Sequence, residues 1–358
     1  MPVKEKKEVP KPGKEESSGF QTKYIILTIF VVLIFILIIG NGFLNKIGDE
    51  TLFCGDGTLY EECSLTQPYF CLDGFLEPKA SVCGCTDILI QQEENCVSKY
   101  QTDSKVVELN YILRGEQRTI DFPVYKGMVD YLSEIPQSIF HSSGETPSRA
   151  DFKLKNIDEE EQRELLIPLV KDIQDITDDE EDQARIAISL VQNIPFGFSE
   201  KEVRLSGGRS INYSRYPYEV LYDVEGICGE KSELLAFLLR ELGYGISFFY
   251  HADENHESLG IECPIEKSLG GTGYCLIETT GPSIITDDSI EYIGGIVLNS
   301  EPEVIPISTG ASLGGNLYEY GDAKVMKKLR NNGFLFFKKF RLNRLKEKYG
   351  LVEEYHPA

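Results

Sequence analysis

An unbroken apolar run near the N-terminus divides this chain into two unequal parts. Residues 24–40 read YIILTIFVVLIFILIIG and contain no charged side chain. Extended to Leu44, the run would form a helix of about 31 Å, which is long enough to cross a bilayer. A buried globular helix is usually shorter, and so is the apolar part of a signal peptide, although cleavage near Gly40 or Gly42 stays open. The run therefore predicts a single transmembrane anchor over residues 24–44.

The charges on either side of this run predict its orientation. Lys46 is the only basic residue close behind it, whereas six lysines precede it: Lys4, Lys6, Lys7, Lys11, Lys14 and Lys23. Because basic residues collect on the cytoplasmic side, we expect a single-pass protein of the cell membrane with its main part outside the cytoplasm. Residues 1–23 are rich in Lys, Glu, Pro and Ser and are expected to be a disordered cytoplasmic tail.

The part of the chain behind the anchor is strongly acidic. The whole chain has a formal net charge of −22, and residues 47–323 carry 51 acidic against 19 basic side chains. A body this acidic repels a phosphate backbone, which argues against nucleic acid as a partner. The hydrophobic content of 41% is sufficient for a packed core.

Six of the nine cysteines fall within 43 residues, at Cys54, Cys63, Cys71, Cys83, Cys85 and Cys96. Turn-forming residues separate them, so residues 45–100 have little apolar core of their own. An oxidising exterior and an even count favour three disulfides, although a zinc site is the alternative. Fifteen pairings of six cysteines are possible, and the sequence does not choose among them. We favour a disulfide-linked spacer or interaction module over residues 45–100.

Residues 101–310 show alternating and helical patterns typical of an α+β domain. Residues 106–140 predict one or two strands followed by a helix, and Pro168 is expected to interrupt or kink an acidic helix over 157–176. Leucines then recur at helical spacing after Cys228, and Gly243 is a natural stop. Cys228 therefore begins a helix of about fourteen residues. A helix N-terminus stabilises a thiolate, which suggests a nucleophile, and a small buried cysteine is the alternative.

A nucleophilic thiol needs a base, and the chain contains only four histidines. His141 and His356 have no supporting pattern, and His251 precedes a short acidic turn. His256 opens an alternating segment in which Leu259, Ile261 and Cys263 share one face of a predicted strand. We expect His256 to project from the opposite face.

A second predicted strand, residues 274–280, carries Glu278 and Cys275. In an antiparallel hairpin, Glu278 would accept a hydrogen bond from His256, and a disulfide between Cys263 and Cys275 would close the intervening loop. Direct pairing of the two cysteines, however, places Glu278 opposite Gly260. Both contacts are therefore expected together only if the register shifts between them.

At these residues the sequence resembles the transglutaminase-like superfamily, a branch of the papain-like cysteine enzymes. The resemblance covers roughly residues 180–285 and is based on the segments PYEVL (217–221), GICG (226–229), LGYG (242–245), the strand opened by His256, and IETT (277–280). It implies a helix carrying the nucleophile at its N-terminus, packed on an antiparallel sheet. Carried over residue by residue, it implies Cys228 as nucleophile, His256 as base and Glu278 as the acid that orients it. The family has Asp where Glu278 stands.

The resemblance implies an enzyme that attacks an amide carbonyl of a peptide or protein substrate and forms a thioester, which water or an amine then resolves. No cofactor or metal is implied. The Cys228 backbone N–H would donate to the oxyanion, and Tyr213, Tyr216 and Tyr222 are unranked candidates for a second donor. A catalytically inactive module that binds proteins or glycans at the cell surface is the alternative.

The C-terminal residues 311–358 contain a basic segment, 324–348, with ten Lys or Arg residues and four phenylalanines at 334, 336, 337 and 340. It would form either a helix lying on anionic lipid or, as we favour, a helix docked on the acidic body. Asn331, Asn332 and Gly333 are expected to interrupt it.

Overall fold

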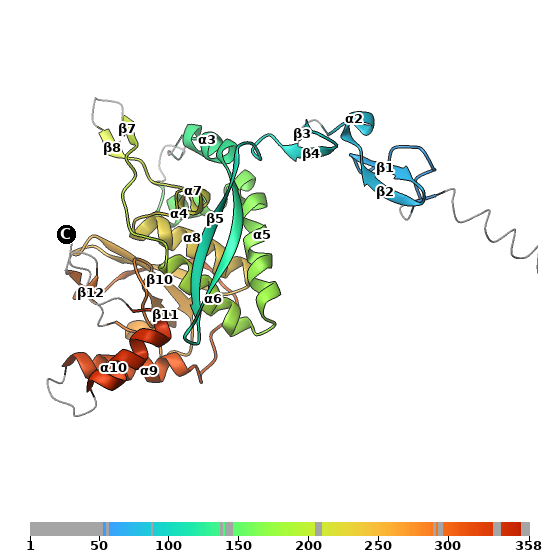
Figure 1. The fold of residues 1–358 in the computed structure, drawn as a ribbon. Coiled ribbons are helices and arrows are strands. Elements are labelled where there is room, and N and C mark those ends of the chain that lie inside the picture. The colour runs from blue at the N-terminus through green and yellow to red at the C-terminus, as the bar shows by residue number, and fades with distance from the viewer. Residues whose placement is uncertain are drawn as a thin grey trace, which may run out of the picture. The chain divides into compact units, whose positions relative to one another are not determined.

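The computed structural model describes residues 53–54, 57–86, 89–136, 139, 146–204, 210–288, 291–292, 296–331 and 338–351 (Figure 1). The chain divides into two compact units, Met1–Ser98 and Lys99–Ala358. Together they form a mixed α+β protein with small antiparallel sheets and disulfides. No helix within the described ranges is long and apolar enough to cross a membrane, and the predicted anchor at 24–44 lies outside those ranges.

The first unit is a loop-rich module with two small hairpins. Its elements are β1 (Tyr69–Leu72), β2 (Phe75–Pro78), α2 (Ala80–Cys83), β3 (Leu89–Gln92) and β4 (Asn95–Ser98). Strand β1 pairs with β2 and β3 with β4, both antiparallel. The prediction of three disulfides is confirmed, in the pairing Cys54–Cys71, Cys63–Cys83 and Cys85–Cys96. The zinc alternative is wrong, because these pairs leave none of the six thiols available to a metal.

The second unit begins with a long hairpin and continues with four helices. The hairpin consists of β5 (Ser104–Leu113) and β6 (Glu116–Tyr125). The helices are α3 (Lys126–Glu134), α4 (Arg149–Ile157), α5 (Glu160–Ile176) and α6 (Glu180–Gln192). Val107, Leu109 and Tyr111 are buried, as their alternation predicts. Helix α5 continues through Pro168, so of the two expected effects of this proline, a kink or an interruption, the interruption is wrong.

A four-stranded antiparallel sheet forms the other half of this unit. Its order is β11–β10–β9–β14, with β9 (Ile246–His251), β10 (His256–Glu262), β11 (Tyr274–Ile277) and β14 (Glu303–Ser308). Helix α8 (Cys228–Glu241) contacts β9 and β10, and helices α4, α5, α6 and α7 (Pro217–Asp223) also contact α8. Every residue from Glu230 to Leu239 is consequently buried. Leu259, Ile261 and Cys263 all belong to the main core, as expected for one strand face.

Short elements complete the fold around the sheet: β7 (Glu202–Arg204), β8 (Ser210–Asn212), the 3-10 turn η1 (Leu269–Gly271), β12 (Glu291–Tyr292) and β13 (Ile296–Val297). At the C-terminal end, α9 (Tyr318–Asn331) contacts α10 (Lys338–Tyr349), and α10 also contacts β5. Leu345 of α10 is buried beside Met326 and Leu329 of α9. The basic segment thus includes a helix docked on the second unit.

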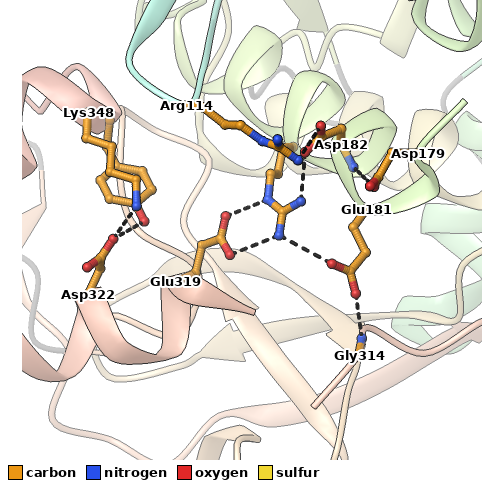
Figure 2. Close-up of polar contacts among 10 residues, drawn as sticks. Arg114, Asp179, Glu181, Asp182, Gly314, Glu319, Asp322 and Lys348 are labelled. Carbon is orange, nitrogen blue, oxygen red and sulfur yellow. Dashed lines mark hydrogen bonds and ion pairs between the residues drawn. The ribbon is translucent and has the colours of Figure 1, made fainter. Parts of the chain in front are cut away.

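Arg185, a buried residue of α6, connects this helix to Glu319 at the start of α9. Figure 2 shows the surrounding residues Glu319, Asp182 and Arg114. Arg185 donates from Nε to Glu319 Oε1 at 2.6 Å and from Nη1 to Asp182 Oδ1 at 2.8 Å. Arg114 from the β5–β6 hairpin reaches Asp182 Oδ2 at 2.7 Å. Further along α9, Asp322 accepts from Lys348 Nζ of α10 at 2.6 Å. These contacts hold the C-terminal helices against the helical half of the unit.

Candidate active site

Cys228 is the first residue of α8 and is half-buried. All nine cysteines lie in the described ranges, and Cys228 is the one that forms no disulfide. Glu230 caps this end of the helix, because its carboxylate accepts from the backbone N–H of Ile227 at 3.1 Å and of Arg215 at 2.8 Å. The N–H of Cys228 is in the first turn, where backbone donors have no acceptor within the helix.

His256 and Glu278 meet at the end of the sheet beside this helix start. The imidazole Nε2 lies 2.9 Å from Glu278 Oε2, and the two residues are 5% and 3% exposed. The other oxygen of Glu278, Oε1, accepts from Thr280 N at 2.7 Å and from the Thr280 hydroxyl. Gln192 of α6 donates from Nε2 to the Glu278 carbonyl at 2.8 Å. The carboxylate is therefore held by several donors besides His256.

The strand register differs from both sequence-based alternatives. Leu259 pairs with Ile277 and Ile261 with Cys275, without a shift along the hairpin. Continued by one residue, this register places Glu278 opposite Ser258. His256–Glu278 and Cys263–Cys275 are then both diagonal pairs, offset in opposite directions, so no register shift is needed. The predicted Cys263–Cys275 disulfide is confirmed, with a Cα–Cα distance of 5.7 Å.

The electrostatics of His256 favour its charged form. Burial alone would lower the pKa of the imidazole, but hydrogen bonding to Cys228 and Glu278 outweighs burial and raises the pKa to about 10. Because Nε2 contacts Glu278, Nδ1 is the nitrogen left for the Cys228 thiol. A cysteine beside an imidazolium can exist as a thiolate, which is the reactive form of a cysteine nucleophile.

The other histidines do not share this arrangement. His251 lies opposite His256 across the β9–β10 pair, and its Nδ1 is 3.0 Å from the Ser300 carbonyl. Burial lowers the pKa of His251, which favours its neutral form. His141 and His356 lie outside the described residues.

The three candidate tyrosines have different surroundings. Tyr213 donates its hydroxyl to Glu219 Oε2 at 2.6 Å, and the Tyr222 ring faces Lys105. The Tyr216 hydroxyl is buried and has no hydrogen-bond partner among the described residues. The hydroxyl of Tyr213 is therefore engaged, whereas that of Tyr216 is not hydrogen-bonded to any described residue.

A cluster of three charged groups near the nucleophile, Lys153, Glu233 and Glu257, was not predicted from the sequence. Lys153 of α4 forms ion pairs with Glu233 of α8 at 2.7 Å and with Glu257 of β10 at 2.6 Å. A Cβ atom on Gly229 would lie 3.5 Å from Lys153 Nζ, so this ammonium adjoins the helix start. Burial alone would lower the pKa of Lys153, but the two carboxylates raise it above its ordinary value. Glu257, directly after His256, was the one local signal for this cluster.

Two cavities adjoin the loop closed by the Cys263–Cys275 disulfide. Leu269 and Gly270 of this loop line two neighbouring cavities of about 360 and 290 Å³. His251 lines the second one, on the strand next to His256. No group of three or more metal-ligating side chains occurs within the described ranges.

Comparison with known proteins gives no assignment for this chain. No family model matches the sequence, and no curated protein matches it at a significant level.

Proposed function

We propose that this protein is a thiol enzyme that cleaves or transfers amide bonds through Cys228, His256 and Glu278. One observation carries the proposal: the unpaired Cys228 lies at a helix N-terminus and is hydrogen-bonded to the buried His256. On the other side of its ring, His256 contacts the Glu278 carboxylate. The same arrangement supports the resemblance to the transglutaminase-like superfamily, with α8 as its central helix and β9–β11 as its sheet.

In the proposed first step, the Cys228 thiolate attacks the carbonyl carbon of an amide. The carbonyl π electrons move to oxygen, and the N–H of Cys228 donates to this oxyanion. The oxyanion then collapses and the C–N bond breaks, while His256 transfers its proton to the nitrogen. The products are a free amine and a thioester on Cys228.

In the second step, water or a primary amine attacks the thioester. His256, now neutral, accepts the proton of the attacking group, and the thiolate leaves as the new C–O or C–N bond forms. Glu278 stabilises the imidazolium and fixes the ring so that Nδ1 faces the sulfur. Proton transfer of this kind is typically worth about 10²–10⁴ in rate.

Thiol labelling of the full chain tests the proposal without knowledge of the substrate. The protein is purified without reductant, treated with iodoacetamide and digested, and the labelled peptides are identified by mass spectrometry. We expect one labelled site, Cys228, with fast labelling near pH 6 that His256→Ala slows. His251→Ala is the matched control and is expected to leave the labelling rate near that of the unmodified chain.

Slow labelling at pH 6 that His256→Ala does not change would contradict the proposed enzyme activity. It would favour a module that binds proteins or glycans.

If labelling supports the enzyme, denatured proteins of known sequence can be incubated with it in the presence and absence of methylamine. A new free carboxyl group, at a chain terminus or at a glutamine side chain, indicates hydrolysis, whereas a methylamide at that carbonyl indicates transfer. Cys228→Ser is expected to abolish either product.

A further inference from the structure

Lys231 is a fully buried lysine one helical turn after Cys228 on α8. Its exposed fraction is 0%, and its Nζ donates to three backbone carbonyls: Ile194 at 2.5 Å, Thr280 at 3.1 Å and Gln192 at 3.5 Å. The aliphatic part of the side chain packs closely as well. A Cβ atom on Gly226 would lie 3.1 Å from Lys231 Cγ and 3.3 Å from a methyl group of Val220.

The three carbonyls match the three N–H donors of an ammonium group. A neutral amine has two N–H bonds and a lone pair, so it would leave one carbonyl facing that lone pair. The site is thus built for the charged form of Lys231, although burying an ammonium carries a large desolvation cost.

Two of the three carbonyls belong to the residues that hold Glu278. Thr280 donates its N–H and its hydroxyl to Glu278 Oε1, and Gln192 donates its side-chain amide to the Glu278 carbonyl. Lys231 contacts the backbone of both residues. Thr280 and Gln192 each hydrogen-bond to both Lys231 and Glu278, and so connect Lys231 to the carboxylate that contacts His256.

We propose that Lys231 is a positioning residue that fixes Glu278 against His256 and adds a positive charge near the Cys228 thiolate, and that loss of its proton weakens the site. The proposal depends on the function proposed above. It assigns Lys231 no contact with substrate.

The titration of Lys231 supports this role. Burial lowers its pKa to about 7, against the opposing effects of Glu278 and Cys228, which favour the ammonium. Glu278, directly after β11, and Cys228, on the same helix, are the charged groups that face Lys231. His256 lies beyond Glu278. Helix α6 and the segment after it present carbonyls, and Val220 of α7 presents an apolar side chain. The positive charge is therefore present below about pH 7 and is lost above it.

The test measures the rate of Cys228 alkylation by iodoacetamide from pH 5 to 9 in the full chain. In the unmodified protein we expect a rise as the thiolate forms, followed by a separate second step near pH 7 as Lys231 loses its proton. In Lys231→Met we expect this second step to disappear and labelling of Cys228 at pH 6 to be slower than in the unmodified protein. Lys171→Met makes the same change at an exposed position of α5 and should behave as the unmodified chain.

Equal profiles for Lys231→Met and Lys171→Met would overturn the role of Lys231. If Lys231→Met does not fold, the unmodified profile decides, because a profile without a second step near pH 7 contradicts the proposal. Labelling of Cys228 that is slow and independent of His256 would instead contradict the proposed enzyme itself. A purely structural lysine would change thermal stability without moving the pH profile.

Discussion

His256 and Glu278 are diagonal neighbours across the end of the β10–β11 pair, and they nevertheless meet at 2.9 Å. Diagonal positions on neighbouring antiparallel strands lie farther apart than directly opposed ones, at roughly 7–8 Å between backbones. The extra methylene of glutamate, compared with aspartate, helps to bridge that separation. The departure from the Asp of the resembled family thus has a geometric explanation in this register.

Glu278→Asp is therefore expected to impair the proposed activity, although it keeps the charge. The shorter side chain would not reach His256 Nε2, and a misplacement of about 1 Å at a catalytic group can cost about 10²-fold in rate. The readout is the rate of amide cleavage or transfer, together with alkylation of Cys228 at pH 6. Glu278→Gln is the control that keeps the size of the side chain and removes its charge. Full activity of Glu278→Asp would show that the diagonal geometry is unimportant.

Sequence patterns were sufficient for the faces of the hairpin and insufficient for its register. Alternation assigns Cys263 and Cys275 to one face, but it does not say which residues lie opposite one another. Two diagonal contacts of opposite offset satisfy the same alternation, and the sequence analysis treated both as direct pairs. The helix that begins at Cys228 was easier to predict from the sequence, because its leucine spacing and Gly243 define both ends.

The residues that support the site were harder to predict. Lys153 lies on α4, far along the chain from Cys228, and only packing of α4 on α8 brings it to Gly229. Lys231 stands between Glu230 and Glu233 in a stretch that reads as a solvent-facing turn. It is buried because helices and sheet surround α8, which is a property of the tertiary fold.

The contacts of His256 with Cys228 and Glu278 predict a pH-dependent contribution to stability. The pKa of His256 is raised from 6.5 to about 10 in the folded protein, so folding favours the protonated ring. The contribution is fully present below about pH 6.5 and is lost as the pH rises towards about 10. Urea unfolding of the full chain and of His256→Gln should therefore differ most at pH 6 and least at pH 10. A difference that grows with pH would contradict the assignment.

The Cys263–Cys275 disulfide is expected to stabilise the second unit without being required for its fold. It closes a loop with a sequence separation of 12, which corresponds to about 3 kcal/mol in the chain-entropy model. Replacing both cysteines by serine should lower the free energy of unfolding of that unit by this order, as measured by urea denaturation.

The matched control for this disulfide is the pair Cys85–Cys96, which has a separation of 11 and belongs to the first unit. Its double serine variant should leave unfolding of the second unit unchanged. Equal effects of the two double variants on the second unit would show that the units do not unfold independently.

Arg185 is expected to be the most sensitive ionic position away from the candidate active site. Its partners Glu319 and Asp182 are 2% and 6% exposed, so Arg185→Met leaves buried carboxylates with fewer compensating charges. Removal of one partner from a buried ion pair typically costs about 3–5 kcal/mol. Arg118→Met is the control, because Arg118 pairs with Glu116 on the surface, where such pairs contribute about 0–1 kcal/mol. The free energy of unfolding in urea should therefore fall much more in Arg185→Met than in Arg118→Met. Limited proteolysis of Arg185→Met should release the α9–α10 segment early. Similar stabilities of the two variants would mean that the network in Figure 2 does not hold the C-terminal helices in place.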